Sequence, residues 1–352
     1  MISRALVRYL LAIALVCIGT RMFAQVSAYY LSPIGPTNDW ISLGINQAGE
    51  VVGTNSSGQA FIFSLSAGTK IIGATGTSAR AINDSGQIAM QVANHAQIFT
   101  RSTGHLTDLG TLGGLTSSPR AINSSGVVVG QSQDSTGQFF PFMFNGGPMF
   151  SLGSFGGSSP SCEANGVNAS GEAVGVCLNA ANFPRAFYVL KGFKDFDPSH
   201  TNYSSGANAI NDSGVAVGAS KRVPCAPMSL NVCEGPAWRP AIFNPNGTIQ
   251  VLGSLAGANG GDTIANAINN PGDIVGDSPA PGGGFHGFIF TNGKLLDLNN
   301  WSFRDTSNNP LIGWVIKTAD GINDFGQIVG RAFDPTGTLQ IVLLTPVKFI
   351  VP

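Results

Sequence analysis

Apolar and polar positions follow a ten-residue pattern that recurs along this chain. Each copy has a small residue, an aliphatic residue, Asn, two variable residues, Gly, one variable residue, two mostly aliphatic residues and a last position that is usually Gly. The copies are GINQAGEVVG (44–53), AINDSGQIAM (81–90), AINSSGVVVG (121–130), GVNASGEAVG (166–175), AINDSGVAVG (209–218), AINNPGDIVG (267–276) and GINDFGQIVG (321–330). Such a repeat predicts one small structural unit whose copies pack against their neighbours.

The Asn of each copy and the Gly three residues later predict a tight turn. An Asn side chain accepts a hydrogen bond from the backbone N–H two residues on, and Gly adopts positive φ without strain. β-Branched residues flank the turn, so each copy is expected to form a hairpin with a type I turn and a bulge. A ring of amides lining a ligand site is the alternative role for these residues, while the alternating Asp and Asn of a calcium loop are absent. The turn residues are Asn46, Asn83, Asn123, Asn168, Asn211, Asn269 and Asn323.

The intervals between copies contain two further strand signals. An aromatic and aliphatic run such as Phe61-Ile62-Phe63 comes first, and a short segment such as DLGTLGG from Asp108 follows a Gly-containing turn. Each period of 37 to 58 residues, measured from Asn to Asn, therefore contains about four short antiparallel strands. The sequence predicts an all-β fold, a seven-bladed β-propeller of four-stranded antiparallel blades. A parallel β-helix is less compatible, because its shorter coils do not require a hairpin in every period.

The seventh copy is too close to the C-terminus to supply its own last strand. Residues 30–35, YLSPIG, resemble DLGTLG at 108–113. We therefore predict that an N-terminal strand completes the seventh blade and closes the ring, which removes both sheet edges. Deletion of residues 25–35 is expected to lower the melting temperature sharply.

The first 24 residues have the features of a secretory signal peptide. Arg4 and Arg8 precede an apolar run at 10–18, and Met22-Phe23-Ala24 is a plausible cleavage site. We expect residues 25–352 to be a single propeller domain that is exported to an extracellular, periplasmic or cell-surface location, without a membrane span after cleavage. An uncleaved anchor is the alternative.

Composition narrows the classes of partner. Charged residues make up 11% of the chain, and Gly contributes 47 of its 352 residues, as expected for short strands joined by many turns. Loss of the predicted signal removes three of the 18 basic residues and none of the 19 acidic ones, which leaves 15 − 19 = −4. A weakly acidic chain without basic clusters is a poor nucleic-acid or anionic-membrane binder. The expected state is a monomer, and no motif points to a cofactor.

The decamer, the aromatic run and the DLGTLGG segment together resemble the bacterial HAF-type extracellular repeat family. The resemblance covers nearly all of residues 28–346. The His-Ala-Phe motif of the family is degenerate in this chain, and its nearest copies are Gln59-Ala60-Phe61, Arg185-Ala186-Phe187 and His286-Gly287-Phe288. The resemblance implies an exported bacterial protein and carries no established activity.

Four cysteines remain after the predicted signal, an even number in an exported chain. Cys162 and Cys177 lie on either side of one turn, within one residue of cross-strand register, and are predicted to form a disulfide. Cys225 and Cys233 are predicted to form a second one across a short loop. Each bond would contribute about 2 to 3 kcal/mol in the chain-entropy model. A thiolate metal site is the alternative, although no CxxC motif or neighbouring His accompanies these residues.

Function is expected on the face opposite the decamer turns. The connections on that face vary in length, and the longest are 219–239, 253–264, 277–285 and 298–319. Variable loops on a rigid ring commonly carry binding, and aromatic and Arg side chains are favoured anchors. Packing within the blades is the alternative role for these residues. The candidate ligand contacts are Trp238, Arg239, Trp301, Phe303, Arg304, Asp305 and Trp314.

The sequence favours a binding scaffold over an enzyme. The four His at 95, 105, 200 and 286 lack ligand spacing, and no phosphate-binding loop is present. The leading hypothesis is a scaffold for a protein or glycan partner. A structural surface or matrix component is one alternative, and a glycan-active hydrolase or lyase is the other. The carboxylates that such an enzyme would use are Asp195, Asp197, Glu234, Asp262, Asp305 and Asp320.

Overall fold

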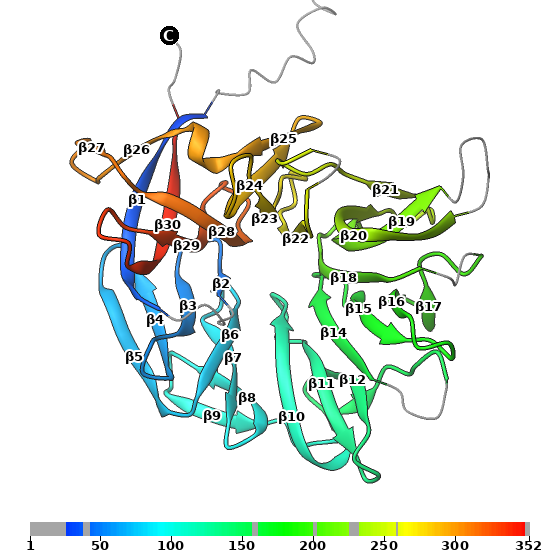
Figure 1. Ribbon diagram of the computed structural model, residues 1–352. Helices are drawn as coiled ribbons and strands as arrows, with labels where there is room; N and C mark the ends of the chain where they lie inside the picture. The colour runs from blue at the N-terminus through cyan, green and yellow to red at the C-terminus, as the bar shows by residue number, and fades with distance from the viewer. Residues whose placement is uncertain are drawn as a thin grey trace, which may run out of the picture.

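The computed structural model describes residues 26–37, 43–156, 161–199, 203–224, 232–257 and 260–348. These residues form seven sheets arranged as blades in a ring (Figure 1). The predicted signal peptide lies outside the described residues, and no helix within them is long and apolar enough to cross a membrane. The prediction of a seven-bladed β-propeller is confirmed.

The first three blades each contain four strands that follow one another in the sequence. Blade 1 has β2 (Gly44–Ile45), β3 (Val51–Thr54), β4 (Gln59–Ser64) and β5 (Gly68–Thr75). Blade 2 has β6 (Ser78–Ile82), β7 (Gln87–Val92), β8 (His95–Thr100) and β9 (His105–Asp108). Blade 3 has β10 (Gly113–Ile122), β11 (Val128–Asp134), β12 (Phe139–Phe144) and β13 (Phe150–Ser151).

Blades 4 to 6 repeat this order. Blade 4 has β14 (Cys162–Val167), β15 (Ala173–Leu178), β16 (Pro184–Val189) and β17 (Phe193–Asp195). Blade 5 has β18 (Ser205–Ile210), β19 (Ala216–Pro224), β20 (Val232–Phe243) and β21 (Ile249–Val251). Blade 6 has β22 (Ile264–Ile268), β23 (Ile274–Pro279), β24 (Phe285–Thr291) and β25 (Lys294–Asp297), and the short 3-10 helix η1 (Leu298–Asn300) follows it.

Blade 7 joins the two ends of the chain. It contains β28 (Val315–Ile322), β29 (Ile328–Phe333) and β30 (Leu339–Lys348), and β1 (Val26–Pro36) pairs antiparallel with β30. The blue and red strands lie side by side in Figure 1. The predicted closure by the N-terminal strand is therefore confirmed. Two short strands that the repeat does not predict extend this sheet on its outer side: β26 (Ser302–Arg304), which is parallel to β1, and β27 (Pro310–Leu311).

The decamer turns have the predicted hairpin geometry. In blade 3 the Gly126 N–H donates to the Asn123 carbonyl at 3.0 Å, and the Asn123 N–H donates to the Val127 carbonyl at 3.0 Å. Gly126 has φ of 82°, a conformation that Gly adopts without a Cβ penalty. The Asn123 Oδ1 accepts from the N–H groups of Ser125 at 3.0 Å and Val127 at 2.9 Å. The side chain therefore bonds two turn N–H groups, of which the sequence predicted the first.

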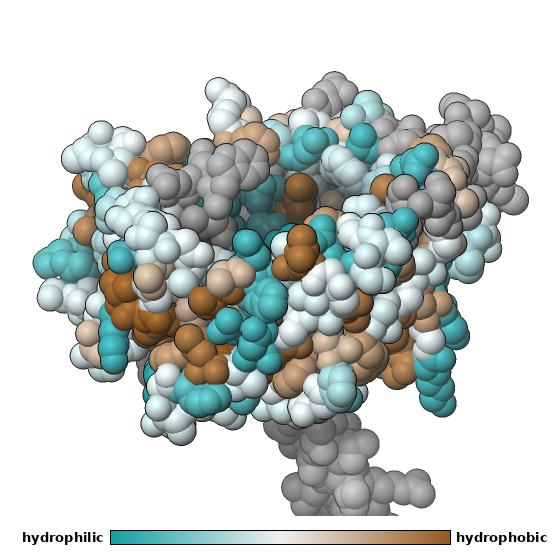
Figure 2. All heavy atoms as spheres, turned by 90° about the horizontal axis from the view of Figure 1, so that it is seen from below, coloured by the Kyte–Doolittle hydropathy of each residue, from teal (hydrophilic) through white to brown (hydrophobic). Residues whose placement is uncertain are grey.

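The hydrophobic core is divided into clusters between neighbouring blades. Between blades 3 and 4, for example, Val129 packs with Ala164 and Phe187, all three fully buried. The aromatic run of the third strand supplies the largest of these side chains. On the side of the molecule seen in Figure 2, apolar side chains form separate patches between polar ones. The ring is therefore held by packing between the blades rather than by one central core.

Strand order divides the loops between two faces of the ring. The decamer turns and the loops between third and fourth strands lie on one, here called the turn face. Loops between second and third strands and the connections between blades lie on the other, the long-loop face. The first strands of the blades, from β2 to β28, surround the centre in Figure 1. The region along this axis is called the central channel, because residues at the ends of these strands line a cavity.

Candidate binding site in the central channel

A closed ring of side-chain hydrogen bonds joins the seven turns at the channel. Each turn Asn donates from Nδ2 to the backbone carbonyl of the corresponding Asn in the next blade, and these side chains are 3% to 6% exposed. In chain order from Asn46→Asn83 the distances are 3.3, 3.0, 2.9, 3.2, 3.3 and 3.1 Å, and the ring closes with Asn323→Asn46 at 3.0 Å. The amides are thus committed to joints between the blades, which favours a structural role over the alternative of a ligand site.

A cavity of about 380 Å³ opens at the turn face of the channel. It is lined by six of the seven turn Asn and by the residues directly before and after the turn Asn in all seven copies. The residues after Asn also bond one another: the Gln47 N–H donates to Asp84 at 2.8 Å, and the Asn270 N–H donates to Asp324 at 2.8 Å. Asn270 Nδ2 lies between carboxylate oxygens of Asp212, at 2.9 Å, and Asp324, at 3.0 Å. Much of the polar lining at this end is therefore part of the framework.

We expect the charge of a neighbouring side chain to determine how much unfolding free energy is lost when a turn Asn is replaced by Asp. Asn168 Nδ2 also donates to the Glu172 carboxylate at 2.6 Å, whereas the equivalent neighbour of Asn123 is Val127. Asn168→Asp would place a carboxylate against Glu172 and the Asn211 carbonyl, so unfolding free energy should fall by about 3 kcal/mol. Urea denaturation of the mature chain measures this loss. Asn123→Asp is the matched control with a smaller expected loss, and equal losses would contradict the argument.

Farther inside the channel, a β-bulge interrupts the first strand of six blades. The register shifts fall between Ala79 and Ala81 in blade 2 and between Ala164 and Gly166 in blade 4, with equivalent shifts in blades 3, 5, 6 and 7. A bulge leaves one residue outside the pairing and re-aims its side chain. The bulged residues lie three positions before the turn Asn, and we call them the inner belt: Arg80, Arg120, Asn165, Asn208, Asn266 and Asp320.

The final Gly of the decamer accommodates this bulge. A Cβ on Gly175 would lie 2.0 Å from the Glu163 carbonyl oxygen, and one on Gly330 would lie 2.1 Å from that of Thr318. In these two blades the carbonyl of the bulged first strand approaches the second strand too closely for a side chain, whereas blade 2 forms the same bulge with Met90 at this position.

One arc of the inner belt is neutral and internally bonded. Asn165 donates to the Ala207 carbonyl at 3.0 Å, Asn208 donates to that of Ala265 at 2.9 Å, and Asn266 donates to that of Ala319 at 3.1 Å. Each amide thus reaches the first strand of the next blade, and these contacts place the belt around the channel. The three amides therefore form a second set of hydrogen bonds between adjacent blades.

The other arc of the inner belt is charged. Arg120 Nη2 lies 2.7 Å from Glu163, and its Nε is buried and has no hydrogen-bond partner among the described residues. Burial lowers the pKa of Arg80, the neighbouring Arg120 lowers it further, and Glu163 opposes this shift. Asp320 pairs with Arg331 at 2.9 Å. In a chain with few charged residues, the channel therefore concentrates both signs of charge.

Asp277 adds a carboxyl group on the side of blades 6 and 7. Burial raises its pKa, its hydrogen bond from Asn266 at 2.6 Å lowers it, and the nearby Asp320 raises it. Within the described part of the chain, no group of three or more His, Cys, Asp or Glu side chains is arranged to hold a metal ion.

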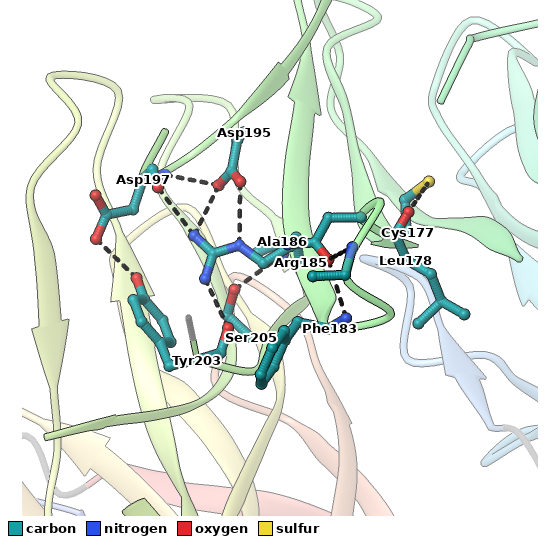
Figure 3. A network of polar contacts seen from close by, with 11 residues as sticks. Cys177, Leu178, Phe183, Arg185, Ala186, Asp195, Asp197, Tyr203 and Ser205 are labelled. Atoms are coloured by element: carbon teal, nitrogen blue, oxygen red, sulfur yellow. Dashed lines mark hydrogen bonds and ion pairs between the residues drawn. The ribbon is translucent and has the colours of Figure 1, made fainter. Parts of the chain in front are cut away.

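A buried polar network connects blades 4 and 5 away from the channel (Figure 3). Arg185 is fully buried and donates to both carboxylate oxygens of Asp195, at 3.0 and 3.2 Å. It also donates to the carbonyls of Tyr203 at 2.7 Å and Asp197 at 2.9 Å, and the Tyr203 hydroxyl donates to the Asp197 carboxylate at 2.8 Å. This network fixes the connection between the two blades. Beside it lies a surface cavity of about 430 Å³, lined by Tyr188, Lys194, Asp195, Phe196, Pro198, Pro245, Asn246 and Gly247.

Pairs equivalent to Arg185 and Asp195 occur in two other blades. His95 Nδ1 lies 2.9 Å from Asp108, and His286 Nδ1 lies 2.7 Å from Asp297. In each case a basic residue or His near the start of the third strand meets the Asp at the end of the fourth strand. From the sequence, these His residues were considered only as metal ligands, and their Asp partners were not predicted. The pairs could have been predicted from the Asp that follows each basic residue by 10 to 13 positions, at the same place in the repeat.

Two of the candidate ligand contacts lie at the base of the blade 5 hairpin. The Trp238 N–H donates to Asp262 at 2.9 Å, and the Lys221 ammonium lies 5.5 Å from the centroid of the Trp238 ring. Arg239 donates to the carbonyls of Gly260 and Gly261, both at 2.8 Å. Arg239 therefore holds the connection to blade 6.

The other candidates lie on the outer extension of blade 7 rather than around the channel. Phe303 is 7% exposed and belongs to the core, and the Trp301 ring packs edge-on against Tyr29 at 5.9 Å. Trp314 is partly buried against the same core cluster. Arg304 donates to the Asn308 carbonyl at 3.2 Å, within the turn between β26 and β27. For Phe303 and Trp301 these positions favour the alternative of packing.

Asp195 and Asp197 share the buried Arg185 network, and the other described carboxylates of the enzyme alternative lie on different elements. Asp195 is bound by Arg185, and Asp262 accepts the backbone N–H of Trp238. The Asn309 side chain lowers the pKa of Asp305, and so do the N–H groups of its own turn. Asp320 belongs to the inner belt, and the Glu234 side chain lies outside the described residues. The hydrolase hypothesis has no geometric support in these positions.

The first predicted disulfide is confirmed. Cys162 and Cys177 are cross-strand partners in blade 4, with Cα atoms 4.0 Å apart, and their sulfurs are bonded. Cys225 lies outside the described residues, so the second predicted disulfide, with Cys233, stays a prediction. The structure thus supports one covalent link between the first two strands of blade 4.

Comparison with known proteins supports the fold alone. No family model and no curated protein matches the chain. The extracellular domain of a one component system from B. thetaiotaomicron has a TM-score of 0.53 at 11% identity, over 92% of this chain and 40% of that one. A puromycin-hydrolyzing peptidase from Mycobacterium tuberculosis has a TM-score of 0.52 at 11% identity, over 94% of this chain and 57% of that one. This chain thus spans less than two thirds of either protein, and neither activity follows from such low identity.

Proposed function

We propose that this chain is an exported binding scaffold that takes its ligand in the central channel, from the long-loop face. The observation that carries this proposal is the inner belt. Its side chains lie three residues before the turn Asn, and therefore about 10 Å closer to the long-loop face. Six bulges that place polar and charged residues at one level of the first strands are more than ring closure requires, because the turn Asn already join all the blades.

Export is supported by two independent features of the chain. The predicted signal peptide at residues 1–24 is one, and the Cys162–Cys177 disulfide is the other, since disulfides persist in oxidising compartments. The resemblance to the HAF-type extracellular repeat family points the same way. The partner class that fits this location is a glycan or a protein outside the cytoplasm.

The long-loop face suits a binding role because its connections differ between blades. The link between blades 1 and 2 is short, whereas residues 252–263 and 298–314 join later blades. A rigid ring with loops of unequal length can shape one face without changing the framework. The decamer turns on the opposite face have the same length in every blade.

Two measurements test this proposal. The mature chain is screened against glycan and peptide arrays, and hydrogen exchange is then compared with and without the ligand found. We expect slower exchange in β10, β14 and the inter-blade connections, with little change in the decamer turns. Absence of any ligand, or protection confined to the turn face or the outer side of blade 7, would refute the proposed site.

A further inference from the structure

We propose that the surface cavity between blades 4 and 5 binds an acidic sugar, with the carboxylate of the sugar on Lys194 and its ring against Tyr188. This site lies outside the central channel, so the inference goes beyond the proposed function. The cavity has a volume of about 430 Å³, which is within the range of small-ligand sites. Its lining comes from β16, β17 and the connection after β17 in blade 4, and from the turn between β20 and β21 in blade 5.

Lys194 and Tyr188 lie side by side in the wall of this cavity. They are directly opposite one another in the antiparallel pair of β16 and β17, so their side chains leave the same face of the sheet. Lys194 is exposed, and its ammonium has no hydrogen-bond or ion-pair partner among the described residues. An unpaired ammonium next to an aromatic ring can bind the acidic group of a ligand that packs on that ring.

The Tyr188 ring is held in place by two other aromatic side chains. Its centroid lies 4.9 Å from that of Phe196, which is buried and lies 5.0 Å from the Phe243 ring of blade 5. Tyr188 itself is only partly buried, and its hydroxyl has no hydrogen-bond partner in the part of the chain that the structure describes. A sugar ring has an apolar face of C–H groups that packs on an aromatic face, and a ring that is fixed before binding loses little conformational entropy.

The free polar groups around the cavity are mainly donors. Asp195 is the only carboxylate among the described residues that line it, and it already accepts from Arg185 at 3.0 and 3.2 Å and from the Asp197 N–H at 2.8 Å. The Asp197 carboxylate accepts from the Tyr203 hydroxyl and is not part of the lining. Asn246 Oδ1 accepts two hydrogen bonds within its own turn, which leaves Nδ2 as a donor. An ammonium, an amide and a phenolic hydroxyl favour a ligand that is rich in acceptors and negatively charged.

The experiment compares glucuronate with glucose, which lacks the carboxylate, and with acetate, which lacks the sugar ring. Binding to the mature chain is measured by chemical-shift titration of the isotopically labelled protein. We expect glucuronate to bind at least threefold more tightly than either of the others. Lys194→Gln should lower the affinity for glucuronate at least threefold and leave that for glucose unchanged, whereas Tyr188→Leu should weaken the binding of both sugars. Lys191→Gln is the matched control, because Lys191 is also exposed but does not line the cavity.

Several outcomes would overturn the site. Glucuronate affinity no higher than that of glucose or of acetate would do so, and so would equal losses in Lys194→Gln and Lys191→Gln. Thermal melts identify any loss of folding in Tyr188→Leu, whereas Lys194→Gln changes only an exposed side chain and keeps the test decisive. Each of these outcomes would leave the proposed function standing, because hydrogen exchange in β10 and β14 tests the channel separately.

Discussion

Removal of residues 26–36 from the mature chain should abolish cooperative unfolding of the ring or lower its unfolding free energy by more than about 5 kcal/mol. These residues form β1, whose Tyr29 and Leu31 side chains are each 2% exposed. Loss of a large buried side chain costs about 2 to 5 kcal/mol, and a typical domain has only about 5 to 15 kcal/mol to lose. Removal also leaves β30 without its outer partner. Calorimetry and near-ultraviolet circular dichroism of the truncated chain measure the effect.

A synthetic peptide of residues 26–36 provides the control for this truncation. If the loss reflects an open ring, added peptide should restore the melting transition in proportion to its concentration. The same peptide with Leu31→Asp should fail, because its charge would enter the buried cluster between blades 6 and 7. An unchanged melting temperature after truncation would refute closure by β1.

Arg185→Ala should lower the unfolding free energy by about 3 to 5 kcal/mol, the second largest effect expected from the structure. The guanidinium group is fully buried and donates to Asp195 and to two backbone carbonyls. Its removal leaves a carboxylate and two acceptors in a space that water fills poorly. Urea denaturation of the mature chain measures the loss.

A double-mutant cycle separates the ion pair from the backbone contacts. Arg185→Ala combined with Asp195→Ala should recover part of the loss, because no unpaired carboxylate then remains. The lost bonds to the Tyr203 and Asp197 carbonyls should keep the double variant below the wild type. Full additivity of the two single losses would contradict the network drawn in Figure 3.

Local pattern was sufficient to predict the architecture. Asn, Gly and the flanking aliphatic residues specify a hairpin through interactions that span five positions, and such interactions are visible in the sequence. Closure by β1 was also predictable, because YLSPIG resembles the strand that it replaces. The pairing of Cys162 with Cys177 followed from the same hairpin register.

The candidate site was harder to predict because its residues meet across blades. Asn123 bonds Asn168, 45 positions away, and no local pattern reveals the second use of its side chain. The inner belt lies outside the decamer, at a position occupied by Arg, Asn or Asp in different blades. Trp301 and Phe303 were predicted to contact the ligand because they are aromatic residues in a long connection. Their packing depends on β26 joining β1, a contact outside the repeat.

The hydrogen bonds between the turn Asn residues do not depend on where the chain begins and ends in the ring. The bond from Asn323 to Asn46 crosses 277 positions and measures 3.0 Å, while that from Asn123 to Asn168 crosses 45 and measures 2.9 Å. The joints therefore depend on neighbouring blades and not on chain order. A circular permutant that joins the present termini and opens another inter-blade connection would retain all seven. In evolutionary terms, whole blades can be duplicated or exchanged as units. Each added blade brings one Asn side chain that donates to the next blade and one Asn carbonyl that accepts from the previous blade.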